Sequence, residues 1–152
     1  MYDLASVSSR RMIAGRIASF AIGAAVVLYV ALSAVRTVVV PRGDPVMLTR
    51  GVFLGLRRLF DLRVRRLESY HARDRAMAYY APIGLVMLPG SWVAFTMVGF
   101  TAVFWGLGVD PLRQAFTLSG SSLLTLGVEH PGDLPVTVAA FVEATLGLGL
   151  IG

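Results

Sequence analysis

The chain contains no cysteine and no lysine, and only two histidines among its 152 residues. Without cysteine it has neither a disulfide framework nor a thiolate metal site. Charged residues make up only 15% of the chain, whereas hydrophobic residues make up 56% and the mean hydropathy is +0.71. This composition lies outside the usual range of soluble globular domains and predicts a membrane protein.

All 14 basic residues are arginines, and they give the chain a net charge of +5. A basic excess can indicate a nucleic-acid partner. Here nine of the arginines lie between Arg42 and Arg75, in the segment that separates two long apolar stretches. This distribution favours a membrane-topology signal, and we expect no nucleic-acid partner.

Three apolar stretches are long enough to cross a membrane, which takes about 20 residues. They are Ile17–Val35, Ala76–Val109 with its predicted span at Ile83–Leu107, and Leu134–Gly152, which is interrupted only by Glu143. The first stretch is too long for a signal peptide and lacks a cleavage site. The third stops without a polar flank, so we expect the chain to be a fragment of a longer protein.

The segment Gln114–Val128 is uncharged but too short to cross the membrane as a helix. Asp110 is its predicted capping residue, and Pro111 is its predicted first helical position. Hydroxyl side chains are too dense here for a lipid-facing surface: Thr117, Ser119, Ser121, Ser122 and Thr125. We expect a re-entrant helix and an irregular loop, both buried in protein.

The predicted fold is an all-α membrane protein with three transmembrane helices and a re-entrant segment. Residues 1–40 form the tail and first span, and residues 41–75 form an arginine-rich loop. The positive-inside rule places the Arg42–Arg75 loop in the cytoplasm and Asp110–Asp133 outside a plasma membrane. The tail contains three arginines that favour the opposite orientation, Arg10, Arg11 and Arg16. The nine arginines of the loop outweigh them.

The arginine-rich loop also contains an amphipathic pattern. Its apolar residues recur at helical spacing: Val52, Leu56, Leu59, Phe60 and Leu67. This pattern predicts a helix on the inner leaflet. Four arginines on its other faces are candidates for binding anionic lipids: Arg57, Arg58, Arg65 and Arg66. The alternative, which we favour, is that these arginines only fix the topology.

The sequence FTLSGSSLLTLGVEHPGDLPVTVAAFVEATLGLGLIG resembles the pore-loop region of the two-transmembrane ion channels of the tetrameric potassium-channel type. The resemblance is nearest to a prokaryotic variant with an extra leading span. It implies that residues 76–152 form a pore module in a homotetramer, with the third helix lining the pore. The filter-like residues would be Thr125, Leu126, Gly127, Val128 and Glu129, and the first four would offer oxygens to a permeant monovalent cation. The resemblance implies no other cofactor.

Glu129 stands where the second glycine of the family's filter would be, and the filter's aromatic residue is missing. Four copies of Glu129 and Asp133 would form an acidic outer mouth. The alternatives are an ordinary loop residue at Glu129 and a helix cap at Asp133, and we favour the cap. We expect no divalent metal at Glu129 and His130, because adjacent side chains rarely point the same way.

Two features of the last helix have alternative interpretations. Glu143 is an acid inside a span and therefore a functional candidate. It either faces the pore or has the role that the resemblance implies and that we favour, in which it packs behind the filter and bonds Ser121 or Ser122. Gly147 and Gly149 either permit close packing or form the hinge that the resemblance implies, for which we select Gly149.

The predicted function is a cation channel subunit with passive conduction. The alternative is a non-conducting pore-loop scaffold or sensor. An intramembrane serine enzyme would use Ser119, but no histidine lies in a span and Thr117 occupies the position of the expected glycine. We therefore do not expect an enzyme.

Overall fold

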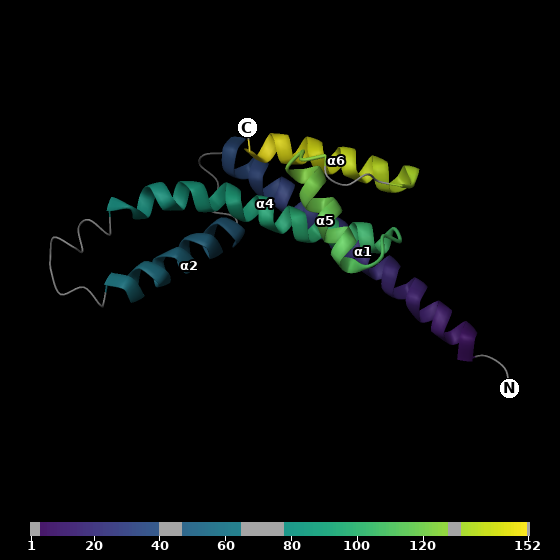
Figure 1. Ribbon diagram of the computed structural model, residues 1–152. Helices are drawn as coiled ribbons and strands as arrows, with labels where there is room; N and C mark the ends of the chain where they lie inside the picture. Colours follow the sequence, from purple (N-terminus) through teal and green to yellow (C-terminus); the bar gives the residue numbers. More distant parts are fainter. Residues whose placement is uncertain (1–3, 40–46, 65–77, 128–131, 152) are drawn as a thin grey trace. The chain divides into compact units, whose positions relative to one another are not determined.

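The computed structural model describes residues 4–39, 47–64, 78–127 and 132–151. All regular structure in these ranges is helical, which confirms the predicted all-α class there (Figure 1). The helices are α1 (Leu4–Val39), α2 (Met47–Val64), α4 (Tyr80–Gly106), α5 (Leu112–Leu123) and α6 (Leu134–Ile151). The chain divides into two compact units, one formed by Met1–Ala31 with Val93–Gly152 and the other by Leu32–Trp92.

Two helices are long and apolar enough to span a membrane. Arg10–Thr37 within α1 has 28 residues, and Pro82–Gly106 within α4 has 25. At 1.5 Å per residue both exceed the hydrocarbon thickness of about 30 Å. Pro82–Gly106 matches the predicted span Ile83–Leu107 to within one residue at each end, whereas Arg10–Thr37 begins seven residues before the predicted Ile17–Val35 and ends two residues after it. The apolar helix Leu134–Leu150 is shorter, so the third span stays a prediction.

In the first unit, α1 and α4 pack through a glycine seam formed by Gly23, Gly99 and Gly106. A Cβ atom on Gly23 would lie 2.5 Å from the Gly99 carbonyl oxygen, so no larger residue fits there without a shift of the backbone. The Ser19 hydroxyl donates a hydrogen bond to the Ala102 carbonyl oxygen at 3.0 Å. Small residues and interhelical hydroxyl bonds hold helices together where lipid removes the hydrophobic drive.

A hydrophobic core joins α4, α5 and α6 within the same unit. Phe100 and Phe104 on α4 are almost fully buried, with ring centroids 6.0 Å apart. The other core residues are Val103, Ala115, Leu118, Val136 and Ala140. The short helix α5 is therefore held between two longer helices rather than lying on their surface.

The start of α5 differs from the prediction. Pro111, not Asp110, is the N-cap residue, and the helix begins at Leu112. The Asp110 carboxylate instead forms an ion pair with Arg16 of α1. The chain turns into this position through Gly108, whose φ of +106° requires glycine. The helix also ends at Leu123, five residues before the end of the predicted segment at Val128.

Candidate functional site

The candidate site is the segment from α5 to the start of α6. Helix α5 has 12 residues, about 18 Å of helix, which is too short to cross a bilayer. Three of its hydroxyl residues are on or near its packed side: Ser119 and Ser121 are buried, and Ser122 is half-buried. Gly120 allows Met97 of α4 to approach, since a Cβ there would lie 2.9 Å from Met97 Cε.

Ser119 is the central anchor of α5. Its side chain is fully buried, and its Oγ lies 2.5 Å from Glu143 Oε1 on α6 and 3.0 Å from the Met97 carbonyl oxygen on α4. One hydroxyl thus connects three helices. Glu143 is also fully buried, and its Oε2 has no hydrogen-bond partner among the residues that the structure describes.

This arrangement gives Glu143 a hydroxyl partner on α5, as the packing interpretation expects, but the partner is Ser119 rather than Ser121 or Ser122. The sequence analysis counted Ser119 among the hydroxyls expected to be buried in protein and considered it as a nucleophile, but it did not name Ser119 as the partner of Glu143. The available signal was its position four residues after Ala115, on the apolar side of α5. Ser121 is also buried and engaged in an interaction.

After α5 the chain forms a tight turn. The Thr125 amide donates to the Ser122 carbonyl oxygen at 3.2 Å, and the Leu126 amide donates to the Ser121 carbonyl oxygen at 2.8 Å. Thr125 has a φ of 53° and Gly127 a φ of 65°. A left-handed conformation is a genuine outlier for β-branched threonine and stores about 1 to 3 kcal/mol. Residues 124–127 are exposed in the single chain.

Two of the predicted filter-like residues, Val128 and Glu129, lie outside the described residues, as does His130. Asp133 is exposed, and its carbonyl oxygen accepts hydrogen bonds from the Thr137 amide and hydroxyl, both at 2.9 Å. Asp133 directly precedes α6, and its role as a helix cap stays a prediction.

The two candidate hinge glycines of α6 have different surroundings. A Cβ on Gly147 would overlap the carbonyl oxygen of Leu123, at the end of α5. Gly149 has open space around it. Gly147 therefore permits close packing, whereas the hinge at Gly149 stays a prediction.

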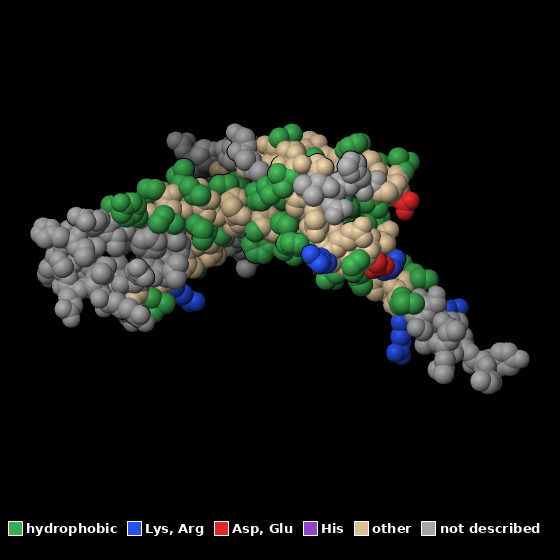
Figure 2. Space-filling model, viewed as in Figure 1, with side chains coloured by type: hydrophobic (Ala, Val, Ile, Leu, Met, Phe, Trp, Pro, Cys, Tyr) green, Lys and Arg blue, Asp and Glu red, His purple; other side chains and the backbone are tan. Residues whose placement is uncertain are grey.

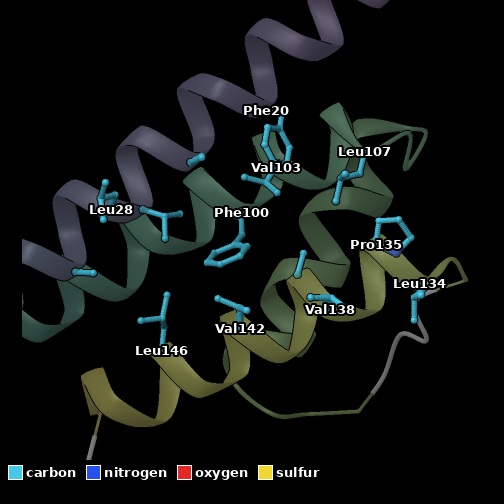
Figure 3. A pocket seen from close by; sticks show the side chains of 14 residues that line it. Phe20, Leu28, Phe100, Val103, Leu107, Leu134, Pro135, Val138, Val142 and Leu146 are labelled. Atoms are coloured by element: carbon cyan, nitrogen blue, oxygen red, sulfur yellow. The ribbon is translucent and has the colours of Figure 1, made fainter.

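An apolar groove of about 720 Å³ runs between α1, α4 and α6 (Figure 3). Phe20, Leu28, Phe100 and Val142 are among the side chains that line it. Figure 2 shows hydrophobic side chains spread over α4 and α6, and charged ones are sparse along both helices. These described surfaces are compatible with membrane insertion.

Among the described residues, no three potential metal-ligating side chains lie together. The described residues of the site offer backbone carbonyl oxygens, hydroxyls and one buried carboxyl group. Comparison with family models, curated proteins and solved structures finds no match to this chain.

Proposed function

We propose that the chain is the pore-forming subunit of a homotetrameric channel that conducts monovalent cations passively. One observation carries the proposal: a helix too short to span is anchored at buried Ser119 and ends in a turn with left-handed residues at Thr125 and Gly127. Irregular backbone at membrane depth is tolerated only against protein or water. A re-entrant pore loop meets that condition.

The physical chemistry of the turn suits a cation. The carbonyl end of α5 carries a partial negative charge, and the turn follows it directly. Carbonyl oxygens of Thr125, Leu126, Gly127 and Val128 would replace part of the ion's hydration shell. A single loop does not surround an ion, so four copies are required. The exposure of residues 124–127 in one chain leaves them available to face the other three.

The proposed topology follows the charge distribution. The Arg42–Arg75 loop would be cytoplasmic, and Asp110–Asp133 would face the outside of the plasma membrane. Glu129 would then add negative charge to the outer mouth and raise the local cation concentration. Its substitution for the family's second glycine removes one expected oxygen site, so the proposal extends to monovalent cations and not to potassium alone.

Ion flux into liposomes tests the proposal. We expect the reconstituted full chain to pass potassium or sodium, and Gly127→Ala to lower that flux at least about ten-fold, because alanine at positive φ costs about 1 to 2 kcal/mol in each subunit. Gly132→Ala is the matched control, since Gly132 has open space and lies outside the left-handed region. If folded wild-type tetramers pass no cation, the proposed channel function is wrong.

The second candidate is a non-conducting pore-loop scaffold or sensor. Glu129 in place of the family's second glycine favours it, because glutamate disfavours the left-handed backbone that a filter uses there. A wild-type protein that assembles as a tetramer and passes no cation would support this candidate.

A further inference from the structure

The exposed side of α2 has an unusual composition. Arg50, Leu54, Arg58 and Leu62 are spaced four residues apart and form one continuous row, which we name the arginine–leucine stripe. All four side chains are exposed, Leu54 by 50% and Leu62 by 63%. Arg57 is exposed as well, and it lies beside the stripe because it is seven residues from Arg50.

A helix that faced only water would gain nothing from exposing leucines between arginines. At a bilayer surface the same alternation is favourable, because leucine side chains enter the boundary with the acyl chains. Arginine side chains extend along that boundary and keep their guanidinium groups among the phosphates. The stripe therefore matches a leaflet surface, where negatively charged phosphates lie next to apolar acyl chains.

Chain connectivity keeps α2 near such a surface. The candidate spans in α1 and α4 precede and follow it, and a span ends where the hydrocarbon ends. Seven residues, 40–46, separate α1 from α2. Fully extended, this connection reaches on the order of 28 Å, so the start of α2 cannot lie far from the headgroups.

We infer that the arginine–leucine stripe, with Arg57 beside it, docks on an anionic lipid leaflet. This side of the helix is opposite the one with Val52 and Leu56, through which the sequence predicted a contact with the leaflet. Leu54 and Leu62 enter the leaflet, and Arg50, Arg57 and Arg58 bind lipid phosphates. This interaction gives the helix a membrane-binding role beyond the topological one. It is independent of whether the proposed pore conducts, because it concerns a different helix and requires no ion flux.

The chain has no cysteine, so a single nitroxide-labelled cysteine at Leu62 reports this contact. The full chain is placed in nanodiscs of phosphatidylcholine, with and without phosphatidylglycerol. Collisions of the label with oxygen and with a water-soluble nickel chelate are compared. With phosphatidylglycerol we expect the label to favour oxygen, as it does inside a leaflet. Without phosphatidylglycerol we expect it to favour the chelate.

Arg57→Gln with Arg58→Gln should shift the equilibrium toward the water-exposed label by about 25-fold, at roughly five-fold for each arginine. Arg10→Gln with Arg11→Gln is the matched control, because it removes the same charge from exposed positions of α1. Two results would overturn the inference: equal shifts from both double variants, or equal insertion in both lipid mixtures. A label protected from both quenchers would indicate a protein partner and would also overturn it.

Discussion

A carboxyl group is among the least favourable side chains to bury, and Glu143 is fully buried. Its burial is made less costly by a hydrogen bond between the Ser119 hydroxyl and Glu143 Oε1. The same serine also reaches the Met97 carbonyl oxygen, so the acid forms part of a connection among α4, α5 and α6. This position indicates a role in holding the short helix in place.

Removing the Glu143 side chain should destabilise the protein more than replacing its carboxyl group with an amide. Glu143→Ala leaves a cavity and a buried serine with a lost partner, and we expect a loss of about 3 kcal/mol or more in the free energy of unfolding. Glu143→Gln keeps the volume and an oxygen near Ser119, so we expect less than half that loss. Denaturant unfolding of the full chain in mixed micelles measures both.

Thr145→Ala serves as the control, because Thr145 is exposed on the same helix and its hydroxyl bonds the Phe141 carbonyl oxygen of that helix. Combining Ser119→Ala with Glu143→Ala should give a coupling energy of about 0.5 to 3 kcal/mol. Strict additivity of the two changes would contradict the stabilising contact. Equal losses from the alanine and glutamine variants would instead show that the carboxyl group itself is required, and not only the volume that it fills.

The sequence indicated that Glu143 needs a hydroxyl partner but not which one. Ser119, Ser121 and Ser122 lie within four residues, so helical periodicity leaves more than one of them near the packed side. The choice depends on the axial offset and rotation of α6 against α5. Those quantities come from side-chain packing along the whole contact, which local spacing does not encode.

At the level of helices, the contact between α5 and α6 depends on a missing side chain. Gly147→Ala would place a Cβ against the Leu123 carbonyl oxygen, which is backbone and cannot move aside easily. We expect it to lower the unfolding midpoint markedly and to separate the end of α5 from α6. Gly149→Ala meets open space and adds a better helix former, so we expect no loss, or a gain of up to about 1 kcal/mol.

Thermal unfolding followed by circular dichroism compares the two glycine variants in the same helix. Similar midpoints for both would show that the close approach at Gly147 is not required. Ion flux adds a separate result for Gly149. If it is the predicted hinge, Gly149→Ala should change channel opening while stability stays unchanged.

Helix existence was predictable, whereas helix ends were less so. The uncharged stretches identified Arg10–Thr37 and Pro82–Gly106 because hydrocarbon sets a minimum apolar length. The predicted cap of α5 was wrong: Asp110 does not cap the helix but pairs with Arg16, which is 94 residues away in the chain. Capping rules describe local preferences, and a distant opposite charge overrode them here.

For the whole molecule, the proposed function requires four chains around one axis. A single cysteine at Leu126, in the exposed turn, should form covalent ladders up to tetramers with a short four-armed maleimide in mild detergent, because each of its four arms takes one thiol. A cysteine at Leu85 of α4 is the control: it is 78% exposed, but no proposed contact between subunits involves it. We expect it to give monomers.

Identical ladders from both positions would indicate random collision within micelles and contradict an ordered tetramer. Monomers from both would contradict the pore and leave a monomeric scaffold. Sequence reasoning reached the tetramer only through the resemblance of its pore-loop segment, because a single chain carries no record of its copies. The charge distribution, by contrast, allowed the sidedness of the arginine-rich loop to be predicted from the sequence.

The glycine seam has a practical consequence for any shortened version of the protein. Within the proposed membrane setting, deleting α1 would expose the backbone around Gly99 and Gly106 to acyl chains, which offer no hydrogen-bond partner, and would leave an empty groove where α1 had packed. It would also remove the partners of Ala102 and Asp110. Helix α1 is thus an integral part of the packing of the first unit. A shortened protein reduced to α4, α5 and α6 would lack the packing partner of α4.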